Sequence, residues 1–456
     1  MKFHFSGICG AGMGNVALLL AEAGHQVKGS DAQFFPPMSD QLEKMNIPIL
    51  EGYGKEKITE IFTPDIQVIA NALSKNHIEA EAAQKAPWIS MSFPQILEEY
   101  ILPERESFVV AGTHGKTTTS SLLSEMLKSK GAGAFIGGVL KNGESACKLG
   151  TGSPFVLEGD EYDTAWFDKH SKFLHYRPKF LLLTHLEWDH VDIFPTFAHM
   201  IAEFKALLDL IPENGCVYYC GDHIHLQELM DDFQGNTCSY GFKENNDLQI
   251  LRSRNENNER VLECEWKSKG EKFELHTQLL GDIYYLNLVG AYGLAREYGC
   301  AHEEIQEHIA HFTGAKRRME ILKTSPYTLI SDFAHHPTSI RETLTILQKE
   351  YPDKEVWAVF DPRNATSRRN TFAREITDAL NLADKVTIGP IHPDARIPEE
   401  ERFNALAVAQ EIGPKATACL NPEELLAQFS KPIAQNSLLI IMSCGSFHGL
   451  IENHLL

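Results

Sequence analysis

The sequence predicts an α/β protein made of three unlike units in series. The chain has 456 residues, enough for about three domains of ordinary size. Short apolar runs lead into Gly-rich turns and then into helical periodicity, at 2–23 and again at 107–130. A third series of apolar runs alternates with helical stretches, near 328–332, 356–360, 385–388 and 437–443. We therefore expect domains at 1–104, 105–312 and 313–456.

Composition limits the partners of the chain. Lys and Arg number 42 against 62 Asp and Glu, a net charge of −20, which argues against general nucleic-acid or anionic-membrane binding. Any phosphate site must be local. Nine cysteines without a C-x-x-C pair favour a reducing compartment, and no stretch is apolar enough to cross a membrane. We expect a cytoplasmic protein with small-molecule substrates, as a monomer or weak homo-oligomer.

The first unit opens with a glycine-rich turn. A strand at 2–6 leads into the run Gly7 to Gly14, a helix follows at 15–23, and a second strand at 26–30 ends at Asp31. This arrangement is typical of a nucleotide diphosphate site at a helix N-terminus. The spacing G-x-x-G-x-G-x-G leaves NAD(P) or FAD and another nucleotide diphosphate equally open. Further strands are expected near 67–72 and 89–92.

The second unit opens with a stronger motif, Gly-Thr-His-Gly-Lys-Thr at 112–117. A strand at 107–111 delivers this turn to a helix at 120–130, so backbone N–H groups and Lys116 converge on one spot and Thr117 can offer a hydroxyl to Mg²⁺. Val110 stands where the longer G-x-x-x-x-G-K-[ST] loop has glycine. The segment predicts a polyphosphate site, and the alternative is a plain strand-to-helix turn.

Two acidic segments follow neighbouring strands of this unit. Residues 158–163 come after a strand at 154–157, and residues 187–192 come after a strand at 180–184. Carboxyl ends of parallel strands meet at one edge of a sheet, and Mg²⁺ prefers oxygen ligands. A carboxylate of the first segment fits that ion, while His190 suits phosphate or a softer ion. For any single Asp, a solvated loop is the competing interpretation.

The rest of the chain offers weaker signals. Alternation over 262–277 predicts an antiparallel hairpin with one solvent-exposed face, before helices at 285–298 and 303–312. In the last unit a strand end carries His335 and His336, which could bind metal, act as bases or cap a loop. The basic run 316–318 is either a solvated linker or a phosphate clamp that acts on domain closure.

The order of these motifs resembles the ATP-dependent Mur ligase family over essentially the whole chain. The matching motifs are G-T-H-G-K-T-T-T, E-G-D-E-Y-D, L-E-W-D-H-V-D, R-R-M-E and D-F-A-H-H-P-T. The resemblance implies a Rossmann-like N-terminal domain, a central P-loop ATP domain and a Rossmann-like C-terminal domain. Within the family, the stretches 158–176 and 442–447 look most like those of the murein peptide ligases. The alanine-adding members typically read E-A-D-E-S-D instead.

The resemblance also implies an activity. A murein peptide ligase joins UDP-N-acetylmuramate to L-Ala-γ-D-Glu-meso-diaminopimelate through an acyl phosphate, in peptidoglycan recycling, with ATP and Mg²⁺. The alternative is the UDP-N-acetylmuramate:L-alanine ligase of de novo synthesis. A dinucleotide-dependent oxidoreductase leaves the Gly-Lys-Thr loop unexplained. A non-catalytic nucleotide-sugar sensor is the remaining rival.

Site residues follow from the resemblance position by position. The expected catalytic residues are Lys116, Glu158, His190, Arg318, Asp332 and His336. The expected ATP-binding residues are Gly112, Thr113, His114, Gly115, Lys116, Thr117, Thr118, Asn287, Arg318 and Asp332. The UDP-sugar would contact Gly7, Ile8, Gly10, Gly12, Met13, Asp31 and Ser74. The expected metal ligands are Thr117, Glu158 and His190.

Two positions remain open within this resemblance. Lys205 lies at the spacing of a carbamylated lysine in several members, and it is equally compatible with a surface residue. Where many members read H-N-x-x-N, this chain reads Ile283 to Asn287, so only Asn287 is retained and the adenine or ribose contact expected at Tyr284 stays open.

Overall fold

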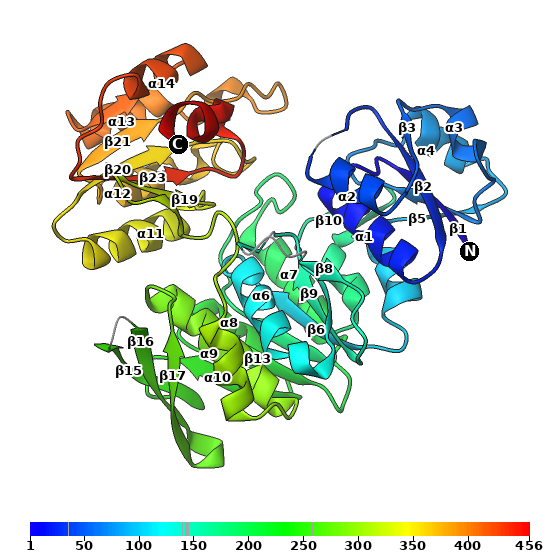
Figure 1. Cartoon of the computed structure of the whole chain (residues 1–456), viewed down its shortest axis with the longest axis horizontal. Coiled ribbons are helices and arrows are strands. Elements are labelled where there is room, and N and C mark those ends of the chain that lie inside the picture. The colour runs from blue at the N-terminus through cyan, green and yellow to red at the C-terminus, as the bar shows by residue number, and fades with distance from the viewer. Residues whose placement is uncertain (35, 139, 142–145, 257–258) are drawn as a thin grey trace. The chain divides into compact units, whose positions relative to one another are not determined.

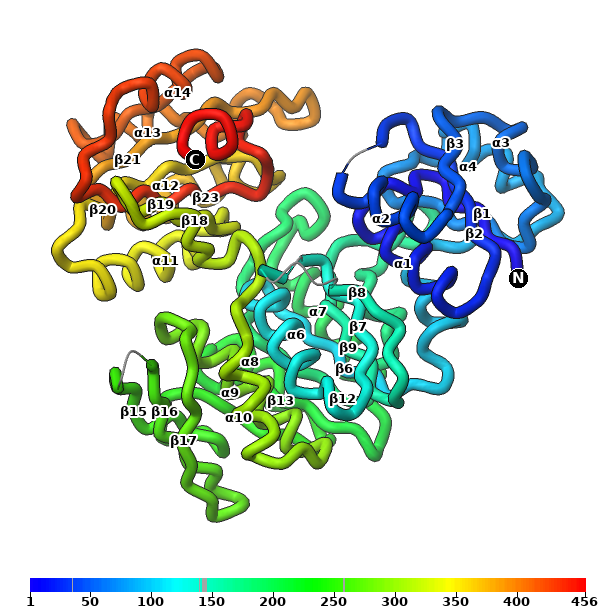
Figure 2. Tube along the Cα trace, in the orientation of Figure 1, coloured from blue at the N-terminus to red at the C-terminus, as the bar shows by residue number. Residues whose placement is uncertain are grey.

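The computed structural model describes residues 1–34, 36–138, 140–141, 146–256 and 259–456 (Figures 1 and 2). The chain divides into two compact units, which are described separately. The first comprises Met1–Glu187, Ala198–Gln278 and Tyr284–Thr313; the second comprises Trp188–Phe197, Leu279–Ile283 and Gly314–Leu456. Among the described residues, no helix has the length and apolar character needed to cross a membrane.

The N-terminal part of the first unit is a parallel sheet with the strand order β3-β2-β1-β4-β5. Its strands are β1 Lys2–Ser6, β2 Gln26–Asp31, β3 Ile49–Glu51, β4 Ile66–Ile69 and β5 Ile89–Met91. Its helices are α1 Ala11–Glu22, α2 Met38–Lys44, α3 Lys55–Thr59, α4 Ile78–Ala83 and α5 Phe93–Ile96. The strands expected at 2–6, before the glycine turn, and at 26–30, after the helix that follows it, are confirmed as β1 and β2.

Helix α1 begins at Ala11, four residues before the predicted start at Asn15. The prediction was wrong because it counted Gly12 and Gly14 as part of the turn. Both glycines lie inside the helix, where a Cβ on Gly14 would collide with the side chain of Met38 in α2. Glycine is used here for close helix packing.

A buried polar cluster joins β1, β2 and α4. Glu79 accepts hydrogen bonds from the Ser30 hydroxyl (2.7 Å) and from the Gly54 amide (3.0 Å), and its carboxylate lies 3.5 Å from Nε2 of His4. Burial lowers the pKa of His4 and Glu79 opposes that effect. Burial alone would raise the pKa of Glu79, but hydrogen bonds from His4 and Ser30 outweigh it and lower the pKa. The pair is therefore a carboxylate beside a neutral imidazole.

The central part of the first unit is a mixed sheet with the order β17-β16-β15-β14-β13-β12-β6-β9-β7-β8. Strand β6 (Glu106–Ala111) lies between β12 (Phe180–Leu183) and β9 (Pro154–Gly159), parallel to both. The predicted hairpin is confirmed as β16 (Glu259–Trp266) and β17 (Glu271–Thr277), and β15 (Leu248–Glu256) adds an antiparallel neighbour. The other elements are β7 Gly133–Phe135, β8 Cys147–Lys148, β10 Asp163–Ala165, β11 Asp168–Ser171, β13 Cys216–Cys220, β14 Asn236–Gly241, α6 Lys116–Met126, α7 Phe197–Leu208, α8 Ile224–Met230, α9 Asp282–Glu297 and α10 His302–Ala310.

The second unit contains a sheet with the order β18-β19-β23-β20-β21-β22, parallel except for its edge strand β18. Its strands are β18 Glu320–Lys323, β19 Thr328–Asp332, β20 Glu355–Phe360, β21 Lys385–Ile388, β22 Ala416–Ala418 and β23 Ser437–Met442. Helices α11 (Pro337–Glu350), α12 (Ala373–Leu380) and α13 (Ala405–Ile412) pack on one face, and α14 (Pro422–Phe429) packs on the other. Polar residues at the carboxyl ends of its strands can therefore meet at one edge.

Candidate functional site

The loop between β6 and α6 has the geometry of an anion site. Gly112 and Gly115 have φ angles of 132° and 81°, which L side chains rarely adopt, and Gly115 is the residue that caps the N-terminus of α6. The helix starts at Lys116, four residues before the predicted Ser120, because Gly115 makes the turn itself. Backbone N–H groups at a helix N-terminus attract anions.

Lys116 forms an ion pair with a residue absent from the predicted catalytic set. Its Nζ donates to the carbonyl of Gly112 (2.7 Å) and to Oε1 of Glu161 (2.8 Å), whose side chain is fully buried. Burial alone would lower the pKa of Lys116, but Glu161 outweighs burial, with help from Glu158 and Asp160, and raises the pKa. Lys116 is therefore a firmly protonated cation at the loop.

Thr117 and Glu158 lie together at the same sheet edge. The Thr117 hydroxyl donates to Oε1 of Glu158 (2.5 Å), and the backbone N–H of Gly137 donates to Oε2 (2.8 Å). A hydroxyl and a carboxylate are hard oxygen donors, which is the ligand type that Mg²⁺ prefers. The structure thus brings the predicted residues Lys116, Thr117 and Glu158 together, and the donor set fits the implied ion.

Asn287 on α9 packs directly against the loop. A Cβ placed on Gly115 would lie 2.5 Å from Oδ1 of Asn287, and the Asn287 side chain is buried. The loop residues Thr113, His114 and Thr118 are buried as well. Close approach, together with the positive φ of Gly115, explains why glycine occupies this position.

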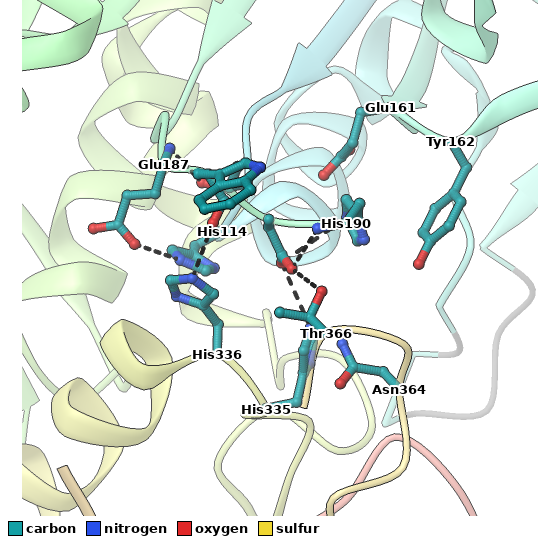
Figure 3. Close-up of polar contacts among 12 residues, drawn as sticks. His114, Glu161, Tyr162, Glu187, His190, His335, His336, Asn364 and Thr366 are labelled. Atoms are coloured by element: carbon teal, nitrogen blue, oxygen red, sulfur yellow. Dashed lines mark hydrogen bonds and ion pairs between the residues drawn. The ribbon is translucent and has the colours of Figure 1, made fainter. Parts of the chain in front are cut away.

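A second polar cluster lies beside the loop, on the segment that follows β12. Nε2 of His114 lies 3.2 Å from Oε2 of Glu187 (Figure 3), and Nε2 of His185 lies 3.5 Å from Oε1 of the same carboxylate. Thr113 Oγ1 lies 3.2 Å from Nδ1 of His185 and accepts a hydrogen bond from the Glu187 amide (3.2 Å). The ligand atoms of the two imidazoles and the carboxylate all lie within 4.8 Å of one another.

Asp31 stabilises the N-terminal glycine turn through hydrogen bonds. The Cys9 amide donates to Oδ2 of Asp31 (2.8 Å), and the Tyr53 hydroxyl donates to Oδ1 (3.3 Å). Ile8 and Met13 have buried side chains, so their contact with a bound ligand would have to come from the backbone. Ser74 is exposed. Asp31 therefore organises the turn, and a direct ligand contact from it stays a prediction.

In the second unit, Asp332 organises a loop. Its carboxylate accepts hydrogen bonds from the backbone N–H groups of Met319 (2.7 Å) and Ala334 (2.8 Å). The Arg318 guanidinium lies over the Phe333 ring, 4.5 Å from its centroid. His336 caps α11, and its Nε2 lies 3.3 Å from the carbonyl of Trp188. Contacts of Arg318 and Asp332 with a nucleotide stay predictions.

The segment Trp188–Phe197 belongs to the second unit, where Asp189 is its buried centre. Oδ1 of Asp189 accepts a hydrogen bond from the Thr366 hydroxyl (2.8 Å), and Oδ2 lies 3.8 Å from His335 Nε2 and 4.0 Å from His190 Nε2. Burial would raise the pKa of Asp189, but His190 and His335 outweigh burial and hold that pKa well below its usual range. His190 adopts a left-handed φ of 51° beside this carboxylate.

Lys205 on α7 is half exposed, and its Nζ lies 3.5 Å from Oδ2 of Asp232. This placement fits the surface alternative. Carbamylation of Lys205 stays a prediction.

Sequence reasoning missed Glu161, Asp189, His185 and Thr366. Glu161 and Asp189 lie inside acidic segments that the motif pattern singled out, so the signal existed at segment level. Nothing in the spacing indicated which carboxylate of each segment would be buried. Thr366 is distant in sequence from its partner and carried no signal.

Comparisons with known proteins identify the family of the chain. Residues 2–104 match the model described as Mur ligase family, catalytic domain; 110–295 match the Mur ligase middle domain; and 317–445 match the Mur ligase, glutamate ligase domain. The UDP-N-acetylmuramate–L-alanyl-gamma-D-glutamyl-meso-2,6-diaminoheptandioate ligase of Escherichia coli K12 is 34% identical, over 99% of this chain and 96% of that protein. The UDP-N-acetylmuramate–L-alanine ligase of Streptococcus mutans is 33% identical, over 86% of this chain and 82% of that protein. The crystal structure of a murein peptide ligase from Psychrobacter arcticus superposes with a TM-score of 0.74 at 28% identity, covering 100% of this chain and 98% of that one.

Proposed function

The chain belongs to the Mur ligase family, and on that premise we propose that it joins UDP-N-acetylmuramate to L-alanyl-γ-D-glutamyl-meso-diaminopimelate, converting ATP to ADP and phosphate. The observation that carries the choice of acceptor is the 34% identity, across 99% of this chain, to a ligase named for that tripeptide. The Haemophilus influenzae ligase of the same name is 31% identical over 98% of this chain.

The phosphate loop supports the nucleotide half of the proposal. ATP phosphates would lie against the N-terminus of α6, where Lys116 supplies a cation, and Asn287 would shape the loop from behind. Thr117 and Glu158 would hold Mg²⁺, with His190 as a further metal or phosphate contact. Bound Mg²⁺ would supply charge neutralisation for the transferred phosphoryl group.

The chemistry then follows from where charge develops. The γ-phosphoryl group of ATP moves to the lactyl carboxylate of the muramate, and Lys116 stabilises the negative charge that spreads over the phosphoryl oxygens. The free amine of the tripeptide attacks the acyl carbon, the amide bond forms, and phosphate leaves with the electrons of the broken C–O bond. An acyl phosphate must be kept from water until the amine attacks.

The N-terminal glycine turn supports the other substrate. Gly7, with a φ of 87°, and the amides that follow it would face the diphosphate of the UDP-sugar at the start of α1. Asp31 would keep this turn in shape through the Cys9 amide.

L-Alanine is the second candidate acceptor, because ligases named for L-alanine are 30% to 33% identical over 86% of this chain. The deciding experiment measures phosphate release with UDP-N-acetylmuramate, ATP and Mg²⁺, comparing the tripeptide with L-alanine. We expect a higher kcat/KM with the tripeptide. A preference for L-alanine would transfer the assignment to the second candidate, and no acceptor-dependent turnover would reject both.

A Lys116→Ala variant identifies the source of any turnover. The matched control is Lys128→Ala. Lys128 lies just after the C-terminus of α6, whose first residue is Lys116, and it pairs with Glu125 (2.9 Å). Turnover that survives in the first variant would come from a contaminating ATPase.

A further inference from the structure

We propose that His114, His185 and Glu187 form a binding site for a divalent transition-metal ion, Zn²⁺ being the best fit, separate from the oxygen site of Thr117 and Glu158. The proposal does not rest on the choice of acceptor or on ligase activity. All three side chains belong to the first unit.

The donor set selects the class of ion. Two imidazole nitrogens and one carboxylate oxygen suit Zn²⁺ and its neighbours, whereas Mg²⁺ is held by oxygen ligands. Ligands about 2.0–2.2 Å from a tetrahedral Zn²⁺ are about 3.4 Å apart. The two imidazole-to-carboxylate distances, 3.2 Å from His114 to Oε2 of Glu187 and 3.5 Å from His185 to Oε1, are close to that spacing, and one ligand atom from each residue lies within 4.8 Å of the other two. Three protein ligands would leave the fourth position for water.

The surroundings of His185 match those of a metal-binding imidazole. Such rings usually donate the second ring N–H to an oxygen, which fixes the tautomer and aims the other nitrogen at the metal. Here Nδ1 lies 3.2 Å from Thr113 Oγ1, so a proton on Nδ1 leaves the lone pair of Nε2 directed at Glu187. The ring of His223 packs against that of His185, with centroids 3.7 Å apart, and restricts its rotation.

Burial and access are also consistent with a metal site. His114 and His185 are nine-tenths or more buried, which limits hydration of the imidazoles. The Glu187 side chain is 29% exposed, so an ion can enter from that side. Leu186 between the two ligands is buried in the core, which anchors the segment that carries both.

The site would couple an ion to the phosphate loop, because His114 lies between Gly112 and Gly115 of that loop. An ion bridging His114 to the segment after β12 would tie two connections of the sheet together. A hydrogen-bonded His–Glu–His cluster without an ion is the competing explanation of the same contacts.

The test uses the full chain without a histidine tag, stripped with a chelator and titrated with Zn²⁺ against a chromophoric competitor in excess Mg²⁺. We expect one tight equivalent of Zn²⁺ per chain. His185→Asn and Glu187→Gln should weaken binding by more than about 100-fold, beyond the usual effect of losing an orienting partner. His225→Asn is the matched control, since His225 faces Glu228 on the surface at 3.1 Å, and should bind as the wild type does.

Glu158→Gln separates the two sites. Zn²⁺ binding that persists in Glu158→Gln supports the proposal, and binding lost there places the ion at the oxygen site and overturns it. Absence of stoichiometric binding in the wild type, or wild-type binding by His185→Asn, overturns it too. If the variants fail to fold, X-ray absorption of the Zn²⁺-loaded wild type decides, because fewer than two imidazole ligands would reject the site.

Discussion

Nζ of Lys116 lies 2.8 Å from Oε1 of the fully buried Glu161, so the positive charge of the loop lysine is paired with a carboxylate of the protein itself. In the proposed ATP complex, the phosphates compete with this carboxylate for the same cation. The Glu161 carboxylate therefore supplies the negative charge that pairs with Lys116 and keeps its side chain at the loop.

Glu161→Gln should destabilise the nucleotide-free protein by about 3 kcal/mol, because one member of a buried ion pair is left without its partner. Bound ATP restores the missing negative charge, so nucleotide should raise the Tm of this variant more than that of the wild type. Thermal unfolding with and without ATP and Mg²⁺ measures both quantities. Equal shifts in the two proteins would show that ATP does not engage Lys116.

Glu158→Gln should lower turnover by about 100-fold or more and raise the Mg²⁺ concentration needed for half-maximal rate, since an amide is a weaker ligand for a hard cation. Steady-state rates over a Mg²⁺ titration test this. Glu125→Gln, on α6, is the control and should keep the wild-type profile. An unchanged Mg²⁺ requirement in Glu158→Gln would argue against Glu158 as the ligand.

Thr366→Val should destabilise the second unit by about 1–3 kcal/mol, because Oδ1 of the buried Asp189 loses the hydroxyl that donates to it. Urea denaturation followed by near-ultraviolet circular dichroism reports the loss. Thr417, on β22, supplies the comparison: Thr417→Val removes an exposed hydroxyl and should change the free energy of unfolding little. Similar effects in both variants would remove the special role of Thr366.

The free energy of unfolding should fall as the pH drops from about 7.5 to about 5.0. Burial lowers the pKa of His4 below its ordinary value of 6.5, so the unfolded chain takes up this proton first and acid favours unfolding. The pKa of Glu79 is also lowered, so its contribution is present above 4.5 and is lost only at still lower pH.

Urea titrations at several pH values, on the wild type and on His4→Gln, isolate this effect. The variant removes the titrating imidazole and should show a smaller loss between about pH 7.5 and 5.0. A parallel dependence in both proteins would assign the acid sensitivity to other groups.

The α/β class, the strands around both glycine turns and the hairpin could be predicted from sequence because they depend on local periodicity and turn chemistry. The starts of α1 and α6 could not be located, since Gly12 and Gly14 serve packing inside a helix while Gly115 serves a turn, and spacing does not separate these uses.

That Lys116, Thr117 and Glu158 lie close together was predictable, because the motif and a neighbouring strand end meet at one edge of the sheet. Their buried partners were not. Glu161 and Asp189 each lie among several neighbouring carboxylates in the sequence. Which of these carboxylates is buried depends on the path of the folded backbone. Thr366 meets Asp189 only through a contact between residues 177 positions apart.

The close approach of Asn287 to Gly115 restricts how this phosphate loop can evolve. Any side chain at position 115 meets both a left-handed backbone and the Asn287 amide, so a substitution there strains the backbone and displaces the Asn287 side chain. Transfer of the loop between β6 and α6 alone into another protein would also leave out α9, whose Asn287 packs against Gly115.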